Sequence, residues 1–217
     1  MGLPTHHPET KARIVRALDP LEEAEDLERV RAGARRGDHD LEPGWRAGEP
    51  LRPAAVLVPI VDRPAALTVL LTQRTQHLAQ HGGQVSFPGG RVEASDGSPI
   101  QTALRETREE VGIPRDLVEP VGVLSPYETV TGFLVIPVVG FVSDRIEPVV
   151  DPTEVEAAFE IPLAAVLEER TYRRGRSRVG QRKRSFYFLA EQPRFVWGAT
   201  AGMLRDLFRR YHGKPGP

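Results

Sequence analysis

The sequence has no cysteine, few aromatic residues and almost no net charge. Without cysteine the chain cannot form disulfides or use a thiolate nucleophile, which fits the reducing cytoplasm, where we expect it to work. Its formal charge of −1, from 29 basic and 30 acidic residues, argues against general binding to nucleic acid or to a membrane surface. No segment approaches the roughly 18 apolar residues of a membrane-spanning helix, and the N-terminus lacks the apolar stretch of a signal peptide. We therefore expect neither a membrane nor a nucleic acid as a partner.

The composition is that of one domain with an N-terminal extension. Hydrophobic residues make up 40% of the 217-residue chain, which suffices for one buried core but hardly for two domains. Apolar residues at helical spacing predict a helix from about Pro20 to Arg36, followed by a linker over Gly37–Pro50. We expect a helical extension and linker in 1–50 and a single domain in 51–213. The extension packs against that domain or, alternatively, against a second copy in a homodimer.

After the linker, β-branched and leucine-rich runs alternate with helical patterns. Two runs flanking a short turn predict a hairpin, and a later arginine-rich hairpin is expected to turn near Gly180. This alternation indicates an α/β fold with a mixed β-sheet between helices. The predicted strands, the arginine-rich hairpin and the last helix are Pro53–Val61, Leu67–Arg74, Gln84–Phe87, Leu117–Leu124, Phe133–Val142, Arg170–Leu189 and Ala199–Tyr211.

A well-capped helix is predicted over Pro99–Val111. Ser98 is a suitable N-cap, and the proline that follows it suits the first helical position, where no backbone N–H is needed. Gln101 stands where a capping box places its second partner. Gly112 can adopt the left-handed conformation that ends a helix. The boundaries of this helix are therefore the most strongly specified in the chain.

Three glutamates share one face of this helix near its C-terminal end. Glu106 and Glu110 are four residues apart, and Glu109 is three residues from Glu106. Like charges at this spacing cost about 0.2–0.5 kcal/mol, and acidic groups near the negative end of the helix dipole cost about 0.3–1 kcal/mol each. Arg105 alone cannot balance three carboxylates. The cluster therefore predicts an oxygen-preferring divalent cation, Mg²⁺ or Mn²⁺.

The stretch that ends in this helix resembles the Nudix box, Gly-x5-Glu-x7-Arg-Glu-U-x-Glu-Glu-x-Gly-U, in which U is aliphatic. Thr107 stands at the first aliphatic position, and counting from Gly90 places the first acidic position at Asp96, with one extra residue before Arg105. The resemblance implies a Nudix-type α/β/α sandwich and a metal-dependent hydrolase of phosphoanhydrides, in which Arg105 orients the carboxylates. The second half of the box is matched by Arg105, Glu106, Glu109, Glu110, Gly112 and Ile113.

The same resemblance implies roles for the acidic residues. Glu106 and Glu110 are expected to be the principal metal ligands, together with the backbone carbonyl of Gly89. Glu109 is expected to be a further ligand or the general base. Glu154 is a rival for the base, because proteins that share this box take their base from different places.

A second motif lies directly before the box. The stretch Leu70–Gly90 resembles the motif Leu-Leu-Thr-x-Arg-Ser/Ala-x3-Arg-x3-Gly-x3-Phe-Pro-Gly-Gly of coenzyme A pyrophosphatases, although Ala79 replaces its second arginine. This implies cleavage of coenzyme A or acyl-CoA into 3′,5′-ADP and 4′-(acyl)phosphopantetheine. Hydrolysis of ADP-ribose or NADH, and nucleotide binding without turnover, are the alternatives. The residues expected to contact the small-molecule substrate are Arg74, Gly83, Gln84, Phe87 and Gly90.

The arginine-rich hairpin has two interpretations. Its basic side chains form a solvated surface, or they contact an extra phosphate of the substrate or a nucleic acid. The neutral total charge of the chain favours the substrate over a nucleic acid.

Overall fold

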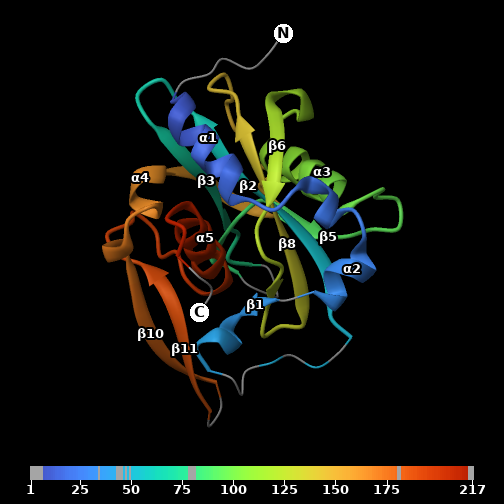
Figure 1. The fold of residues 1–217 in the computed structure, drawn as a ribbon, viewed down its shortest axis with the longest axis vertical. Helices are drawn as coiled ribbons and strands as arrows, with labels where there is room; N and C mark the ends of the chain where they lie inside the picture. The colour runs from blue at the N-terminus through green and yellow to red at the C-terminus, as the bar shows by residue number, and fades with distance from the viewer. Residues whose placement is uncertain are drawn as a thin grey trace.

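The computed structural model describes residues 7–33, 35–42, 46, 48, 50–77, 82–179 and 182–214. Within these residues the chain forms a nine-stranded mixed sheet and a separate two-stranded sheet (Figure 1). The strands are β1 (Arg36–Gly37), β2 (Arg52–Asp62), β3 (Leu67–Arg74), β4 (Val85–Ser86), β5 (Gly89–Arg91), β6 (Val118–Val123), β7 (Tyr127–Glu128), β8 (Phe133–Val142), β9 (Val155–Pro162), β10 (Tyr172–Val179) and β11 (Arg182–Leu189). The helices are α1 (Pro8–Ala17), α2 (Leu27–Ala32), α3 (Pro99–Val111), α4 (Leu163–Val166) and α5 (Gly198–Tyr211), with short 3₁₀ helices η1 (Leu21–Ala24), η2 (Asp38–Asp40), η3 (Arg115–Leu117) and η4 (Glu169–Thr171).

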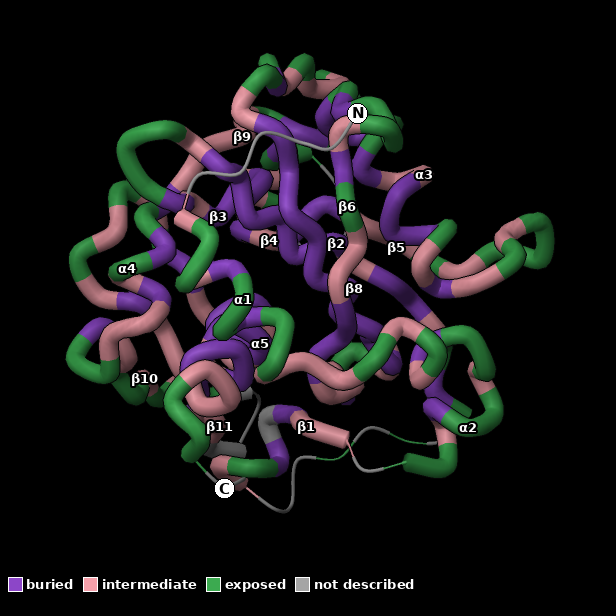
Figure 2. Tube along the Cα trace, turned by 45° about the horizontal axis from the view of Figure 1, so that its top comes forward, coloured by how far each residue is buried: buried purple, intermediate pink, exposed green. Residues whose placement is uncertain are grey.

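The parallel pair β2 and β8 forms the centre of the larger sheet. The two strands pair along the whole of β8, and both are buried over most of their length, as expected for strands covered on two faces (Figure 2). Alternate residues of β2 enter different cores. Val58 and Ile60 join a core with α1 and α5, whereas Leu57 and Val61 join a second core with α3. These two cores confirm the predicted α/β fold, with a mixed sheet between helices.

Helix α3 begins and ends where the sequence predicts. The Ser98 hydroxyl accepts a hydrogen bond from the backbone N–H of Gln101 at 3.3 Å, and Gly112 ends the helix with a φ of 67°. The side chain of Gln101 accepts from the backbone N–H of Gly97 at 3.2 Å, one residue before the partner that a capping box would use. Local capping is thus sufficient to fix this helix.

The helix predicted over Pro20–Arg36 is wrong, because the segment forms η1 and α2 separately. The Asp26 carboxylate accepts hydrogen bonds from the backbone N–H groups of Glu28 at 2.9 Å and Arg29 at 3.2 Å. An aspartate that caps a helix in this way begins a new helix instead of continuing the previous one. In the part of Gly37–Pro50 that the structure describes, the predicted linker contains η2 and the end of β1.

Helix α1 joins the N-terminal segment to the sheet. The Lys11 ammonium lies 3.0 Å from the Asp62 carboxylate at the end of β2, and both side chains are buried. Ile14 is fully buried in the core that contains α5. Strand β1 pairs in parallel with β7. The described part of the first fifty residues therefore packs on the sheet, while the division of the chain near residue 50 stays a prediction.

Strands β2, β3, β4, β6 and β8 lie close to their predicted ranges, whereas β1, β5, β7 and β9 have no predicted counterpart. The arginine-rich hairpin is β10 and β11, which pair antiparallel from Tyr172↔Leu189 onwards. Gly180, its predicted turn, and Ala79 lie outside the described residues. Among the residues described, none of the helices combines the length and apolar composition that crossing a bilayer requires.

Candidate active site

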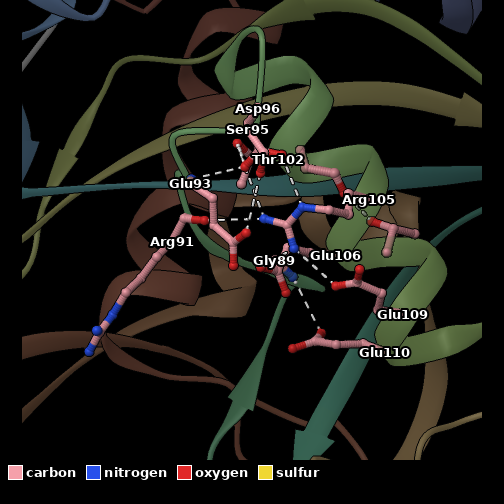
Figure 3. Close-up of polar contacts among 12 residues, drawn as sticks. Gly89, Arg91, Glu93, Ser95, Asp96, Thr102, Arg105, Glu106, Glu109 and Glu110 are labelled. Carbon is pink, nitrogen blue, oxygen red and sulfur yellow. Dashed lines mark hydrogen bonds and ion pairs between the residues drawn. The ribbon is translucent and has the colours of Figure 1, made fainter.

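The glycine turn and the acidic face of α3 meet beside the central strand. Strand β5 pairs with β2, with Gly89 opposite Val56. The backbone N–H of Gly89 donates to the Glu110 carboxylate at 3.3 Å (Figure 3). A side chain at Gly90 would collide with the Glu106 carboxylate. The two carboxylates therefore lie directly against the turn, and the Glu106 carboxylate occupies the space that a side chain at Gly90 would need.

Arg105 connects the acidic groups of this site. Its guanidinium donates to Asp96 through Nε at 3.0 Å and Nη2 at 2.9 Å, and through Nη1 to Glu106 and Glu109, both at 2.9 Å. Figure 3 shows the guanidinium between Asp96 on one side and the two glutamates on the other. The hydrogen bonds from Arg105 hold the pKa of Asp96 well below its ordinary value, and the bond to Asp96 raises the pKa of Arg105. The geometry fits the orienting role predicted for Arg105.

Asp96 lies in the loop that is one residue longer than the Nudix pattern. Its carboxylate also accepts from the Thr102 hydroxyl at 2.8 Å and from the backbone N–H of Glu93 at 3.0 Å. Both carboxylate oxygens are engaged with protein donors. These contacts indicate that Asp96 holds the loop against α3.

Glu110 is the most buried acid of the cluster, with 3% of its surface exposed. Burial raises its pKa to about 8, and the charge of Arg74 and the hydrogen bond from Gly89 offset this only in part. Burial also raises the pKa of Glu106, against the hydrogen bond and charge of Arg105. The two neighbouring carboxylates therefore resist ionisation. A bound cation would favour their charged forms.

The Arg74 side chain contacts two acidic side chains of the protein as well as lining the pocket. Its guanidinium is 3.4 Å from Glu110 and 3.8 Å from Glu154. The charge of Glu154 contributes to the raised pKa values of Glu106 and Glu110, and its side chain is half exposed. The structure thus brings the rival base to the edge of the carboxylate cluster.

The donor set fits Mg²⁺ or Mn²⁺. Carboxylate oxygens are the ligands these ions prefer. Among the described residues, no three His, Cys, Asp or Glu side chains form a group able to hold a metal by themselves. Mg²⁺, however, keeps several waters and is commonly held by one or two carboxylates together with phosphate oxygens. Glu106 and Glu110 beside the glycine turn match that mode of binding, and Gly89 and Glu109 lie within the same cluster.

A pocket of about 680 Å³ opens beside the glycine turn. Of the residues expected to contact substrate, four line it: Arg74, Gln84, Phe87 and Gly90. Gly83 does not line it. Its backbone N–H donates to the carbonyl of Arg74 at 3.0 Å, and its φ is 73°, so it closes the turn that leads to β4.

Several lining residues are not among those predicted one by one to contact the substrate, although Arg184 belongs to the arginine-rich hairpin, for which contact with an extra phosphate is one of the two interpretations. These lining residues come from β7, β8, β11 and the start of α5, and include Tyr127, Phe133, Arg184 and Trp197. The stretches Thr131–Phe133 and Trp197–Ala201 both resemble coenzyme A pyrophosphatases, and residues of both line this pocket. Tyr127 and Arg184 lie 14 and 71 residues beyond the end of the box at Ile113, so the fold brings them together.

Known proteins similar to this chain are Nudix proteins. The NUDIX domain family matches residues 50–191. The uncharacterized Nudix hydrolases NudL of Salmonella paratyphi B and Salmonella newport are each 47% identical over 171 residues, covering 76% of this chain and 85% of theirs.

Some solved structures are similar to part of this chain. A Nudix hydrolase from M. Smegmatis, RenU, is 22% identical with a TM-score of 0.46, covering 53% of this chain and 73% of its own. The MutT protein from Methanosarcina mazei Go1 is 21% identical with a TM-score of 0.44, covering 54% and 81%. Similarities of this degree leave the substrate open.

Proposed function

The chain belongs to the Nudix hydrolase family, and on that basis we propose that it is a metal-dependent pyrophosphohydrolase of coenzyme A or acyl-CoA. Its products are 3′,5′-ADP and 4′-(acyl)phosphopantetheine. The observation that carries the proposal is the placement of Glu106 and Glu110 against Gly89 and Gly90 at the edge of a pocket large enough for part of a nucleotide.

Glu106 and Glu110 are proposed to hold Mg²⁺ or Mn²⁺ together with the carbonyl of Gly89, and Glu109 is a further candidate ligand. When bound, such an ion reduces the charge repulsion at the anhydride and lowers the pKa of a coordinated water. Arg105 keeps Glu106 and Glu109 in position through hydrogen bonds of 2.9 Å.

The general base is proposed to be Glu109 or Glu154. The Glu109 carboxylate is held by Arg105 at 2.9 Å. Among the described residues, the Glu154 carboxylate has an ion-pair contact of 3.8 Å with Arg74. A comparison of Glu109→Gln with Glu154→Gln separates them, because loss of the base lowers kcat by about 10²–10⁴-fold, whereas loss of an orienting contact costs less.

The coenzyme A assignment rests on the motif over Leu70–Gly90. Its Arg74, Gln84 and Phe87 line the pocket beside the glycine turn. The curated relatives are named as Nudix hydrolases, and those names give no substrate. Coenzyme A has an anhydride, a second phosphate on its ribose and an extended arm, which together fit a pocket with several arginines and aromatic side chains.

We further propose that the hydrolase domain occupies 51–213, preceded by the extension in 1–50. The substrate is a small molecule, and we propose that the protein works in the cytoplasm without a membrane or nucleic-acid partner. A homodimer stays a prediction, which sedimentation or light scattering checks.

The proposal is tested with a panel of coenzyme A, acetyl-CoA, ADP-ribose, NADH and a nucleoside triphosphate, each with EDTA, Mg²⁺ or Mn²⁺. Metal-dependent release of 3′,5′-ADP from coenzyme A is expected. Retention of this activity in Glu110→Gln would reject the assigned site. Metal-independent nucleotide binding with no turnover of any compound would instead identify a binding protein.

A further inference from the structure

One wall of the pocket pairs an arginine with a tryptophan, far from α3. Arg184 of β11 and Trp197, directly before α5, both line the pocket. The Arg184 guanidinium lies 5.8 Å from the centre of the Trp197 ring, within the range of a cation–π contact. In Figure 1 the hairpin of β10 and β11 lies on the opposite side of the molecule from α3.

Packing in the hairpin fixes this pair. Arg184 and Phe186 are two residues apart on β11 and so share one face of it. The Phe186 ring packs edge-on against Trp197, with 5.1 Å between ring centres. Phe186 pairs across the hairpin with Gly175, where a Cβ would collide with the Phe186 ring. The glycine thus leaves room for the phenylalanine, which in turn positions the tryptophan.

Phe195 supports the same tryptophan from another direction. Its ring lies 6.1 Å from that of Trp197 at an interplanar angle of 19°. The Trp197 side chain is therefore held by two aromatic neighbours. A preorganised aromatic surface of this kind binds a planar ring at little entropic cost.

The charges lining the pocket are all of one sign. Arg74, Arg91 and Arg184 line it, and no Asp or Glu belongs to the described lining, although the whole chain has a net charge of −1. Arg74 faces Glu110 and Glu154, at the end of the pocket where the anhydride is expected. Arg184 lies on a different wall, at β11. The pocket therefore suits a ligand with a second anionic group away from the anhydride.

We propose that Arg184 and Trp197 form a subsite for the nucleoside end of the substrate, in which Trp197 stacks on the base and Arg184 binds a phosphate monoester on the ribose. The inference rests on the proposed hydrolase function and specifies its substrate class. An amide carbonyl of the substrate's arm is a neutral acceptor for a guanidinium, whereas a phosphate monoester accepts two parallel hydrogen bonds from it with charge on both partners. A nucleobase gains from an aromatic face.

The test compares coenzyme A with dephospho-CoA, which lacks only the ribose phosphate. In Arg184→Met, the ratio of kcat/KM for coenzyme A to that for dephospho-CoA is expected to fall by roughly 10- to 100-fold, the range for loss of a charged hydrogen bond. Arg184→Lys restores part of the ratio. Arg176→Met is the matched control, because Arg176 is an exposed arginine of the same hairpin outside the pocket. An unchanged ratio in Arg184→Met, or an equal fall in the control, overturns the proposal.

A binding measurement tests the proposed subsite even if the protein does not hydrolyse coenzyme A. Trp45 and Trp197 are the two tryptophans of the chain, so in a Trp45→Phe background fluorescence reports on Trp197 alone. Adenosine 3′,5′-bisphosphate is expected to quench this fluorescence at a concentration at least about tenfold lower than AMP does, and Arg184→Met is expected to remove the difference. Equal affinities in the parent protein, or a difference that survives Arg184→Met, would reject the subsite. A failed hydrolysis assay with this preference intact would reject only the proposed reaction.

Discussion

Arg105 and Asp96 face each other in two parallel hydrogen bonds, Nε to Oδ1 at 3.0 Å and Nη2 to Oδ2 at 2.9 Å. Only 5% of the Asp96 side chain is exposed. The pair fastens the loop before α3 to the same guanidinium that holds Glu106 and Glu109. A change at Asp96 should therefore affect both the stability of the protein and the positions of the catalytic carboxylates.

Asp96→Asn is expected to lower the free energy of unfolding by about 1–2 kcal/mol at pH 7, since Arg105 is partly exposed and the contact is partly screened. The pKa of Asp96 is lower in the folded protein than its ordinary value of about 3.9. Its contribution is therefore present above about pH 4 and is lost as the pH falls toward the lowered folded pKa. Urea denaturation in EDTA between pH 7 and pH 3 measures this. The exposed Asp116→Asn is the control, and an equal loss there would contradict the account.

Glu106→Gln and Glu110→Gln are each expected to remove most turnover while leaving stability in EDTA unchanged or slightly higher. A neutral amide relieves the repulsion between carboxylates on α3 and, at Glu110, avoids burying a charge. Mg²⁺ at 100 times its Kd should stabilise the parent protein by about 2.7 kcal/mol and the variants by less. Thermal melts with and without Mg²⁺ check both points, with Glu119→Gln at an exposed position of β6 as the control. A large loss of Tm in EDTA would mean that the carboxylates are structural.

Alanine substitutions at the two neighbouring glycines of the turn should have different effects, one on stability and the other on kcat. A Cβ at Gly89 would lie 2.6 Å from the Val56 Cα and collide with the Ala55 carbonyl, so Gly89→Ala should cost about 1–3 kcal/mol of stability. A Cβ at Gly90 meets the movable end of the Glu106 side chain. Gly90→Ala should therefore lower kcat with little change in Tm. Full kcat in Gly90→Ala would show that Glu106 does not need its observed position.

Lys11→Met tests whether the N-terminal segment is part of the folded unit. It leaves Asp62 buried without its 3.0 Å partner, and the expected loss is about 3–5 kcal/mol. Adding Asp62→Leu should restore much of it, because the charge left behind is removed. Urea denaturation of both variants and of Arg16→Met, an exposed position of α1, provides the comparison. A loss below about 1 kcal/mol for Lys11→Met would indicate an extension that is only loosely attached.

The sequence predicted well those features that local chemistry determines. Ser98 and Gly112 bound α3 by their own backbone geometry, so its ends are correct. The helix over Pro20–Arg36 was mispredicted because apolar spacing alone does not register that Asp26 can cap a second helix. The spacing of the carboxylates was sufficient to place them together.

What the sequence left open depends on distant contacts. Arg74 is sequence-distant from Glu110 and Glu154, so its position between them could not be predicted. Arg184 and Trp197 reach the pocket because the hairpin of β10 and β11 packs against α5. No local pattern determines that packing.

The central claim is best tested by one competition experiment with the purified protein and Mg²⁺. Coenzyme A, ADP-ribose and NADH are mixed at equal concentration, and the products are resolved by chromatography during the first few per cent of turnover. The ratios of the initial rates then equal the ratios of kcat/KM. We predict that 3′,5′-ADP and 4′-phosphopantetheine form fastest and that EDTA stops their formation. Faster release of AMP from ADP-ribose or NADH would contradict the coenzyme A assignment.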